Sequence, residues 1–282
     1  MTQYAYYRSK EKSLREEIVR IGRLMYDRGL TVSNDGNISA RLDDDHILVT
    51  PSGLCKGMMS PDQMIVVDME GKKVGTVTSA NRDLGPTSET PMHLEAYRQR
   101  ADVQAVVHAH PPLTVALSIA GVSLADCMLP EVIVNLGIVP TTKYATPASK
   151  ENVGAIREMI KGHDGIVLQR HGTLTVGRSL LEAFMRLETL EQIAQITLVL
   201  QMLGKGDPLA PEQVAKLLES RKKLDLWHES DADEFCQVCG VCPVDGRPVF
   251  SADHQPASPG ALEEELVRTV TEAVLRELTQ NR

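Results

Sequence analysis

The sequence predicts an α/β domain, because strand-like and helix-like segments alternate along most of its length. The strand pattern is clearest at 106–110, where β-branched residues lead to a histidine pair before Pro111 and Pro112 end the run. The helix pattern is clearest at 9–29 and 180–203, where apolar residues recur at helical spacing.

The remaining elements follow from the same two patterns, taken in chain order. The first helix ends at Gly29, before a polar turn at 33–37. Strands are expected at 38–50 (two strands around an acidic turn), 64–68, 73–75, 132–137, 139–144 and 165–171. Helices are expected at 90–100, 113–120, 150–161 and 212–227. In the first of these helices, we expect His93 to cap the helix or to face solvent.

The composition is that of a globular protein without a nucleic-acid partner. The 282 residues allow one or two domains, and 42% of them are hydrophobic and 24% charged. The net charge of −8 argues against nucleic-acid binding, so a phosphate ligand must be held by local donors. Apolar runs fall short of the ~20 residues that span a bilayer, and the N-terminus lacks the apolar core of a signal peptide. We therefore expect a cytoplasmic protein without a membrane partner, with its five cysteines mostly reduced.

Three histidines form a candidate metal site. His108 and His110 are separated by one residue on a predicted strand, so their side chains point to the same face and can bind one ion together. His171 belongs to a second strand-like run and offers a third nitrogen. Three imidazoles suit Zn²⁺ or a similar divalent ion and leave a coordination position for substrate. The alternative is a histidine pair that only forms hydrogen bonds within the core.

A segment with hydroxyl and carboxylate groups precedes the helix predicted at 90–100. Thr87, Ser88 and Glu89 offer two hydroxyls and a base, and backbone amides at the start of a helix attract anions. The turn at 34–37 can also bring amides close to an anion, unless it is a plain connection between helix and strand. A metal, a base and an anion-binding surface are therefore expected within a short part of the chain.

Five short motifs occur in a defined order along the chain. They are Gly36-Asn37-Ile38-Ser39, Thr50-Pro51-Ser52-Gly53, Thr87-Ser88-Glu89, His108-Ala109-His110 and Gln169-Arg170-His171-Gly172. This order resembles the class II aldolase and adducin family, and in particular its fuculose-phosphate aldolases, over about residues 10 to 205. The resemblance implies a central, mostly antiparallel sheet flanked by helices on both sides, and assembly as a homotetramer.

The resemblance also implies an activity, the reversible retro-aldol cleavage of a ketose 1-phosphate such as L-fuculose 1-phosphate. The products would be dihydroxyacetone phosphate and an aldehyde such as L-lactaldehyde. His108, His110 and His171 would hold Zn²⁺ or another divalent metal. Glu89 would exchange the proton at the enediolate carbon, and would ligate the metal when substrate is absent. The residues implied in phosphate binding are Gly36, Asn37, Ser52, Gly53, Thr87 and Ser88.

One departure from the family concerns the general acid. Fuculose-phosphate aldolases use a tyrosine from a neighbouring subunit to protonate the aldehyde oxygen, and the aligned stretch 127–131 contains no tyrosine. Glu131 and Tyr144 are the alternatives. Sugar-phosphate 4-epimerases and dehydratases use the same metal site, but the epimerases carry aspartate in place of Glu89, which favours an aldolase. A non-catalytic adducin-like binding module would lack the metal ligands that are present here.

The composition changes after residue 227, so we expect a catalytic domain at 1–227 and a linker at 228–258. The linker contains three closely spaced cysteines, Cys236, Cys239 and Cys242. Their spacing resembles part of an iron–sulfur ligand set and also suits a second Zn²⁺. The candidates for a fourth ligand are Cys55, Cys127, His228 and His254. Otherwise the segment is a flexible, thiol-rich linker, or it makes the protein a redox-responsive scaffold.

An amphipathic helix is expected at 259–282, with apolar residues on one side and charged residues on the other. It resembles the encapsulation peptides that direct enzymes into bacterial microcompartments. This resemblance implies a shell protein as partner and a location in the microcompartment lumen. The alternatives are a helix that docks on its own domain or one that makes an oligomer contact; its glutamates argue against a membrane surface.

Overall fold

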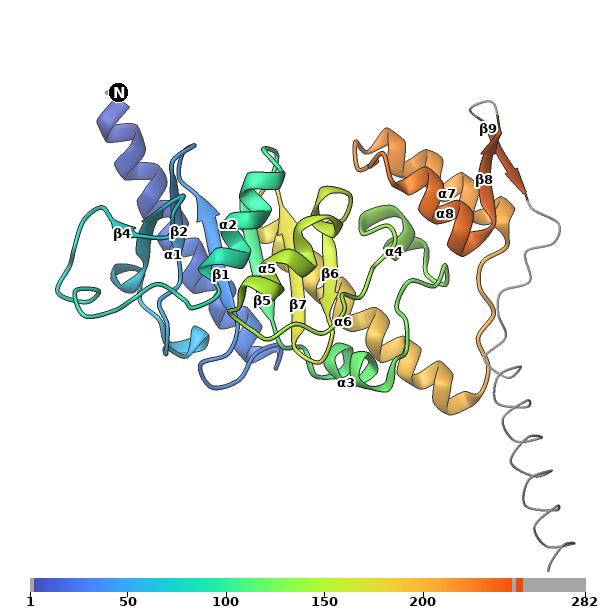
Figure 1. Ribbon diagram of the computed structural model, residues 1–282, viewed down its shortest axis with the longest axis horizontal. Helices are drawn as coiled ribbons and strands as arrows, with labels where there is room; N and C mark the ends of the chain where they lie inside the picture. The colour runs from blue at the N-terminus through green and yellow to red at the C-terminus, as the bar shows by residue number, and fades with distance from the viewer. Residues whose placement is uncertain (1–2, 245–246, 251–282) are drawn as a thin grey trace, which may run out of the picture.

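The computed structural model describes residues 3–244 and 247–250, and a seven-stranded sheet forms its centre (Figure 1). The strand order is β4-β3-β2-β1-β5-β7-β6, and all neighbouring strands run antiparallel. The strands are β1 (Asn37–Arg41), β2 (His46–Val49), β3 (Ile65–Asp68), β4 (Lys73–Val74), β5 (Ala105–Ala109), β6 (Gly165–Leu168) and β7 (Gly172–Gly177). The mostly antiparallel sheet implied by the family resemblance is therefore confirmed.

Helices cover both faces of this sheet and give it two apolar layers (Figure 1). Helices α1 (Gln3–Asp27) and α6 (Leu180–Leu203) pack on one face. Helices α2 (Thr90–Gln99) and α5 (Lys150–Arg157) pack on the other. The other helices are α3 (Pro112–Ala120), α4 (Pro130–Asn135), α7 (Pro211–Lys223) and α8 (Asp231–Cys239), with short 3-10 turns η1 (Lys56–Met58), η2 (Pro61–Gln63) and η3 (Met159–Lys161). In the described part, no helix combines the length and apolar character needed to cross a membrane.

The central strand β5 has a register that positions the histidines. His108 lies opposite Asn37 of β1 and opposite Leu174 of β7. Because side chains alternate along a strand, Val107 points to the layer under α1 and α6, while His108 points toward the layer under α2 and α5. The candidate metal ligands therefore lie on the same side of the sheet as α2.

Two predicted strands were wrong. Residues 132–137 lie largely in helix α4, and residues 139–144 contribute only an isolated bridge between Thr141 and Val167. A six-residue apolar run does not by itself distinguish a buried helix from a strand, and Pro130 favours a helix start. The strand predicted at 165–171 ends at Leu168, so the following residues form the turn into β7.

The linker interpretation does not hold for residues 231–244 and 247–250. They form α8 and a two-stranded hairpin, β8 (Val241–Val244) and β9 (Arg247–Phe250). This extension packs with α7 against α4 around the buried ring of Phe235, and Arg221 of α7 pairs with Asp231 of α8. An apolar surface shared between three short helices is not visible in any one of them, which is why the sequence suggested a linker. The helix predicted at 259–282 lies outside the described residues and stays a prediction.

Asp164, immediately before β6, ties the segment that leads into this extension to helices α2 and α6. Its carboxylate oxygens lie 2.7 Å from Arg100 Nη1, 2.8 Å from Arg186 Nη2 and 3.3 Å from His228 Nε2. Burial alone would raise the pKa of Asp164, but His228 and the two guanidinium groups hold it well below its usual range. The carboxylate therefore stays ionised in the folded protein.

Replacing Asp164 by Asn should lower the free energy of unfolding by about 3 kcal/mol, because Arg100 and Arg186 lose the buried carboxylate they share and keep only the more exposed partners Asp102 and Glu182. The folded-state pKa lies below the ordinary value of 3.8, so this stabilisation is present above pH 3.8 and is lost as the pH falls toward the folded-state pKa. Urea unfolding at pH 7 and pH 3 should show a steeper acid dependence for the wild type than for the variant.

The matched control is Asp225→Asn, because Asp225 pairs with Arg178 but its side chain is 87% exposed. Its stability should change by less than about 1 kcal/mol. Equal effects of the two substitutions would contradict the role assigned to Asp164.

Candidate metal and phosphate site

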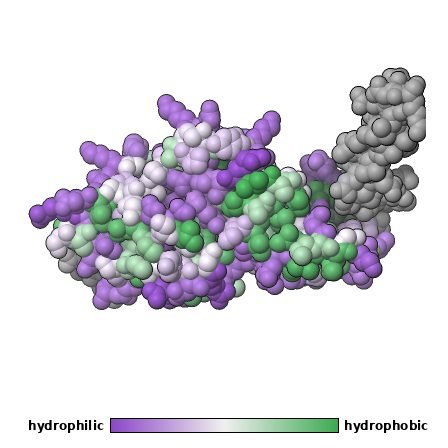
Figure 2. Space-filling model, turned by 90° about the horizontal axis from the view of Figure 1, so that it is seen from below, coloured by the Kyte–Doolittle hydropathy of each residue, from purple (hydrophilic) through white to green (hydrophobic). Residues whose placement is uncertain are grey.

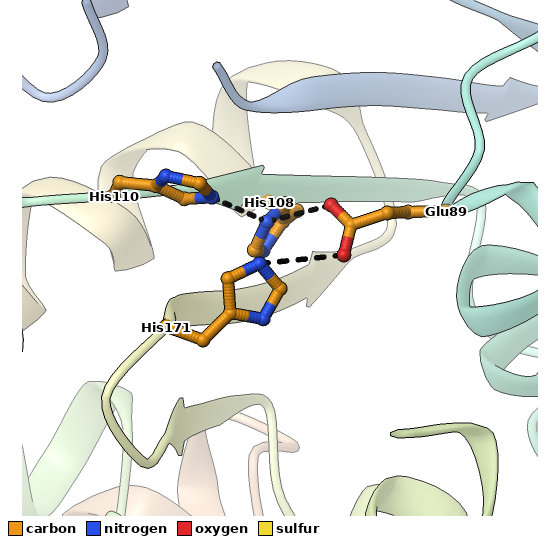
Figure 3. A group of neighbouring side chains, drawn as sticks. All are labelled: Glu89, His108, His110 and His171. Carbon is orange, nitrogen blue, oxygen red and sulfur yellow. Dashed lines mark hydrogen bonds and ion pairs between the residues drawn. The ribbon is translucent and has the colours of Figure 1, made fainter. Parts of the chain in front are cut away.

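Four side chains that can ligate a metal converge at the end of the central strands (Figure 3). His108 lies in β5, His110 follows β5, His171 lies in the turn between β6 and β7, and Glu89 immediately precedes α2. One ligand atom from each residue lies within 4.8 Å of all the others. The structure thus brings together the three histidines and the carboxylate that the sequence indicated.

The hydrogen bonds of this group favour a bound cation. His108 Nδ1 donates to the Thr173 carbonyl at 2.8 Å, which directs Nε2 toward the other ligands. Nε2 then lies 3.0 Å from His110 Nε2 and 2.9 Å from Glu89 Oε2. A proton on Nε2 could satisfy only one of these neighbours, whereas a cation would satisfy both. Glu89 Oε1 and His171 Nδ1 are buried without any hydrogen-bond partner.

The protonation states also fit a metal. Burial, with His108 close by, lowers the pKa of His110 and of His171 to about 4, so both are neutral ligands near pH 7. Burial opposes the ionisation of Glu89, but His108 and the Asn37 amide hold its pKa well below its usual range. Three imidazoles and one carboxylate form a donor set that suits Zn²⁺.

A buried chain of hydrogen bonds leads from Glu89 into the core. Asn37 Nδ2 donates to Glu89 Oε2 at 3.0 Å, so Asn37 Oδ1 must accept from His93 Nε2, 2.5 Å away. His93 Nδ1 must then accept from the Ser39 hydroxyl at 2.7 Å, and Ser39 must accept from the Tyr97 hydroxyl at 2.8 Å. This chain fixes the orientation of the Asn37 amide and hence that of the carboxylate.

The prediction that His93 caps the helix or faces solvent was wrong, because its side chain is fully buried. Burial, with His108 nearby, lowers the pKa of His93 to about 3 and keeps it neutral. The residue is buried because β1 presents Asn37 and Ser39 as partners for both ring nitrogens. The sequence of α2 alone carries no information about that strand.

A cavity of about 220 Å³ opens beside these ligands and contains all the residues implied in phosphate binding. It is lined by Asn34, Asp35, Gly36, Asn37, Pro51, Ser52, Gly53, Lys56, Thr87, Ser88, Glu89, His110, Pro147, Ala148 and His171. Two of its loops are joined by backbone hydrogen bonds, from Ser52 N to Gly85 O and from Thr87 N to Thr50 O. The loops, the carboxylate and two histidines thus form one wall of a single cavity.

Gly36 has to be glycine at this place. Its φ is +71°, and a Cβ there would lie 2.9 Å from the His108 carbonyl oxygen. The turn at 34–37 therefore fits tightly against the histidine strand, which brings the Asn37 side chain to Glu89.

Sequence reasoning missed Lys56, a cation in the cavity wall. Its side chain is almost fully buried, and Nζ donates to the carbonyls of Asn34 at 2.8 Å and Leu54 at 2.5 Å. Lys56 therefore ties the turn at 34–37 to the loop that contains Ser52. Burial lowers its pKa to about 8, against the opposing charges of Cys55 and Asp35, so it is mostly protonated near pH 7. The only sequence signal is a lysine four residues after Ser52.

The alternative general acids are not brought to this site within the chain. The Tyr144 side chain is 58% exposed, and Glu131 lies at the exposed start of α4. Neither residue lines the cavity. A larger cavity of about 500 Å³ contains the Asp164 ion pairs and His228, one of the candidate fourth ligands of the cysteines, but none of the residues predicted for the metal and phosphate site.

The cysteines predicted as a second site lie apart from the histidines. Cys236 and Cys239 belong to α8 and Cys242 to β8. Among their candidate partners, Cys127 is adjacent to Cys239, whereas Cys55 is free and His228 contacts Asp164. The remaining candidate, His254, lies outside the described residues.

Comparison with known proteins supports the family resemblance. Residues 16–198 match the Class II Aldolase and Adducin N-terminal domain. The 3-oxo-tetronate 4-phosphate decarboxylase of Cupriavidus necator is 34% identical over 68% of this chain and 87% of its own length. The L-fuculose phosphate aldolase of Methanococcus maripaludis is 31% identical over 66% of this chain and 96% of its own length.

The fold agrees with these relatives. The crystal structure of YgbL from Escherichia coli superposes with a TM-score of 0.67 at 30% identity, covering 73% of this chain and 98% of that one. The sequence match, the antiparallel sheet with helices on both faces and the convergence of the five motifs agree with one another. The chain therefore belongs to the class II aldolase and adducin family.

Proposed function

We propose that this protein is a metal-dependent lyase that acts on a small phosphorylated keto sugar or sugar acid and breaks the bond between the carbons α and β to the ketone. The observation that carries the proposal is that the three-histidine, one-glutamate donor set borders the cavity formed by the loops implied in phosphate binding, with Glu89, His110 and His171 in the cavity wall. A binding module without catalysis would need neither a buried donor set nor a positioned carboxylate. The adducin-like alternative is therefore disfavoured.

The phosphate would bind at the loops, through backbone amides and hydroxyls together with the charge of Lys56. This anchor would place the ketone of the substrate next to His108, His110 and His171. A divalent ion held by these residues would act as a Lewis acid that stabilises negative charge on the substrate oxygens. Asn37 holds Glu89 through Oε2, and Oε1 accepts no hydrogen bond and lies 3.4 Å from His171 Nε2, so Oε1 would carry a proton to or from carbon.

The leading reaction is retro-aldol cleavage of a ketose 1-phosphate such as L-fuculose 1-phosphate. The C4 hydroxyl gives its proton to Glu89, the C3–C4 bond breaks, and C4 leaves as the aldehyde carbon of L-lactaldehyde. The electron pair of the bond stays on the phosphorylated fragment as an enediolate. Glu89 then protonates C3 and releases dihydroxyacetone phosphate.

Decarboxylation of a 3-oxo-tetronate 4-phosphate is the second candidate, and relatives with that activity favour it. Loss of CO₂ from C1 of this acid leaves the same enediolate, and its protonation at C2 again gives dihydroxyacetone phosphate. This reaction needs no acid at an aldehyde oxygen, which agrees with the positions of Tyr144 and Glu131 outside the cavity. The two reactions thus share the phosphate site and Glu89 and differ in the fragment that leaves. Epimerase or dehydratase chemistry remains the alternative if neither substrate is cleaved.

We also propose that the protein is a homotetramer, as the family resemblance implies. Helix α3 and the end of α6 lie at the lower side of the molecule in Figure 1. Figure 2, which views this side from below, shows apolar surface there. Ile119, Val199, Met202 and Leu203 are exposed there, and the Met202 side chain is 79% exposed. An apolar surface of this kind fits a second copy of the chain. A monomer mass in light scattering would contradict this assembly.

The proposal that residues 259–282 bind a microcompartment shell protein rests on their sequence pattern alone. It predicts that the full-length protein co-sediments with assembled shells and that a chain ending at residue 258 does not. Equal co-sedimentation of the two proteins would contradict it.

The first test is release of dihydroxyacetone phosphate by the purified protein from each of two substrates, L-fuculose 1-phosphate and 3-oxo-tetronate 4-phosphate. A coupled glycerol-phosphate dehydrogenase assay detects the product of both reactions, and only the second substrate yields CO₂. We expect turnover of one substrate to be abolished by a chelator and restored by Zn²⁺. No product from either substrate, with the metal bound, would exclude both reactions.

Replacing Glu89 by Gln should lower kcat by about 10²–10⁴-fold, because the protein loses the group that transfers the proton at carbon. The three histidines remain, so metal content measured by mass spectrometry should stay near one ion per chain at this site. Glu70→Gln, at an exposed turn, is the control and should keep full activity. Full activity of Glu89→Gln would contradict its role as the base.

Replacing Lys56 by Met should raise KM for the phosphorylated substrate by about 10- to 100-fold, because a charge-assisted hydrogen bond and a loop contact are lost. Lys216→Met, at an exposed position of α7, should leave KM unchanged. Circular dichroism establishes that both variants are folded. An unchanged KM in folded Lys56→Met would remove Lys56 from the phosphate site.

A further inference from the structure

A second cluster of possible metal ligands lies at the C-terminal end of α8. Cys236 and Cys239 are on α8, Cys242 is on β8, and Cys127 comes from the loop before α4. The structure joins Cys127 to Cys239 and Cys236 to Cys242 in disulfide bonds, with Cα atoms 6.1 Å and 4.2 Å apart. The fold therefore brings a fourth sulfur, from 109 residues earlier in the chain, to the three that are clustered in sequence.

All four sulfurs gather around one turn of helix. Cys236 and Cys239 are three residues apart on α8, so their Cβ atoms are neighbours about 5–6 Å apart. Each has one further cysteine in contact with it. A tetrahedral Zn²⁺ with Zn–S bonds of ~2.3 Å needs its sulfurs roughly 3.8 Å apart. Among the described residues only the histidine–glutamate group already converges as closely as a metal requires, so reduction and rotation of the four cysteine side chains would have to bring their sulfurs to this spacing.

The surroundings favour a cation over free thiolates. The helix α8 ends at Cys239, where the last carbonyl groups and the negative end of the helix dipole attract positive charge. Cys127 and Cys239 are 4% and 8% exposed and belong to the apolar layer that holds the extension on α4. Thiolates in such a place are destabilised unless a metal binds them.

We propose that these four cysteines, when reduced, form a tetrathiolate zinc site. Binding of one Zn²⁺ releases the four thiol protons and transfers no electron. The ion would cross-link α8 and β8 to the loop before α4, at the same places as the two disulfides. A single ion fits better than an iron–sulfur cluster, because the paired Cα atoms are 6.1 Å and 4.2 Å apart and a cluster spreads its thiolates over a larger core.

The test is metal binding by the full-length protein, reduced with a phosphine under argon. With excess Zn²⁺ removed, mass spectrometry should find two zinc ions per chain, one at the histidines and one at the cysteines. Substitution with Co²⁺ should give an intense near-ultraviolet band from thiolate-to-cobalt charge transfer, which the histidine site does not produce. Cys127→Ser, Cys236→Ser and Cys242→Ser should each lose one zinc ion and the band, whereas Cys55→Ser keeps both.

The result that overturns the proposal is a reduced wild-type protein that binds one zinc ion and shows no charge-transfer band with Co²⁺. Thiol titration is the second measurement: after native reduction and removal of the phosphine, the protein is unfolded under argon and should contain five free thiols. A count of one would mean that the disulfides persist, which would also overturn the proposal. Both measurements use the wild type, so they decide the question even if a cysteine variant fails to fold.

Discussion

The register between strands β1, β5 and β7 is the constraint on which the site depends. This register pairs His108 of β5 with Asn37 of β1 on one side and with Leu174 of β7 on the other. A shift of one residue would turn His108 into the layer under α1 and α6 and would separate Asn37 from Glu89. The antiparallel pairing is therefore as important to the donor set as the identities of the histidines.

Under the proposed function, an acidic protein with a net charge of −8 has to bind a phosphorylated anion. The proposed phosphate site would use the amides, hydroxyls and one buried lysine of the cavity wall, and not a field from the whole surface. The Lys56 ammonium lies against two carbonyl groups, so it remains charged despite burial. Local hydrogen bonding thus replaces a basic surface.

The sequence predicted those parts of the site that depend on local spacing or on family motifs. His108 and His110 are separated by one residue on a strand, and the residues expected to hold phosphate all line one cavity. It did not predict the burial of His93 or Lys56, because each depends on partners from distant segments. The helix α8 was missed for the same reason, since the surfaces that cover Phe235 come from α4 and α7. Long-range packing, and not local propensity, decides these positions.

In the hydrogen-bond chain from Tyr97 to Glu89, every residue donates toward Glu89. This fixed direction limits which amino acids can replace the residues of the chain. Ser39 and His93 each accept on one side and donate on the other, so neither can be replaced by a group with only one of these capacities. An aspartate in place of Asn37 would keep the shape but would set a second carboxylate against Glu89. These buried positions are therefore expected to vary together in evolution, as a coupled set.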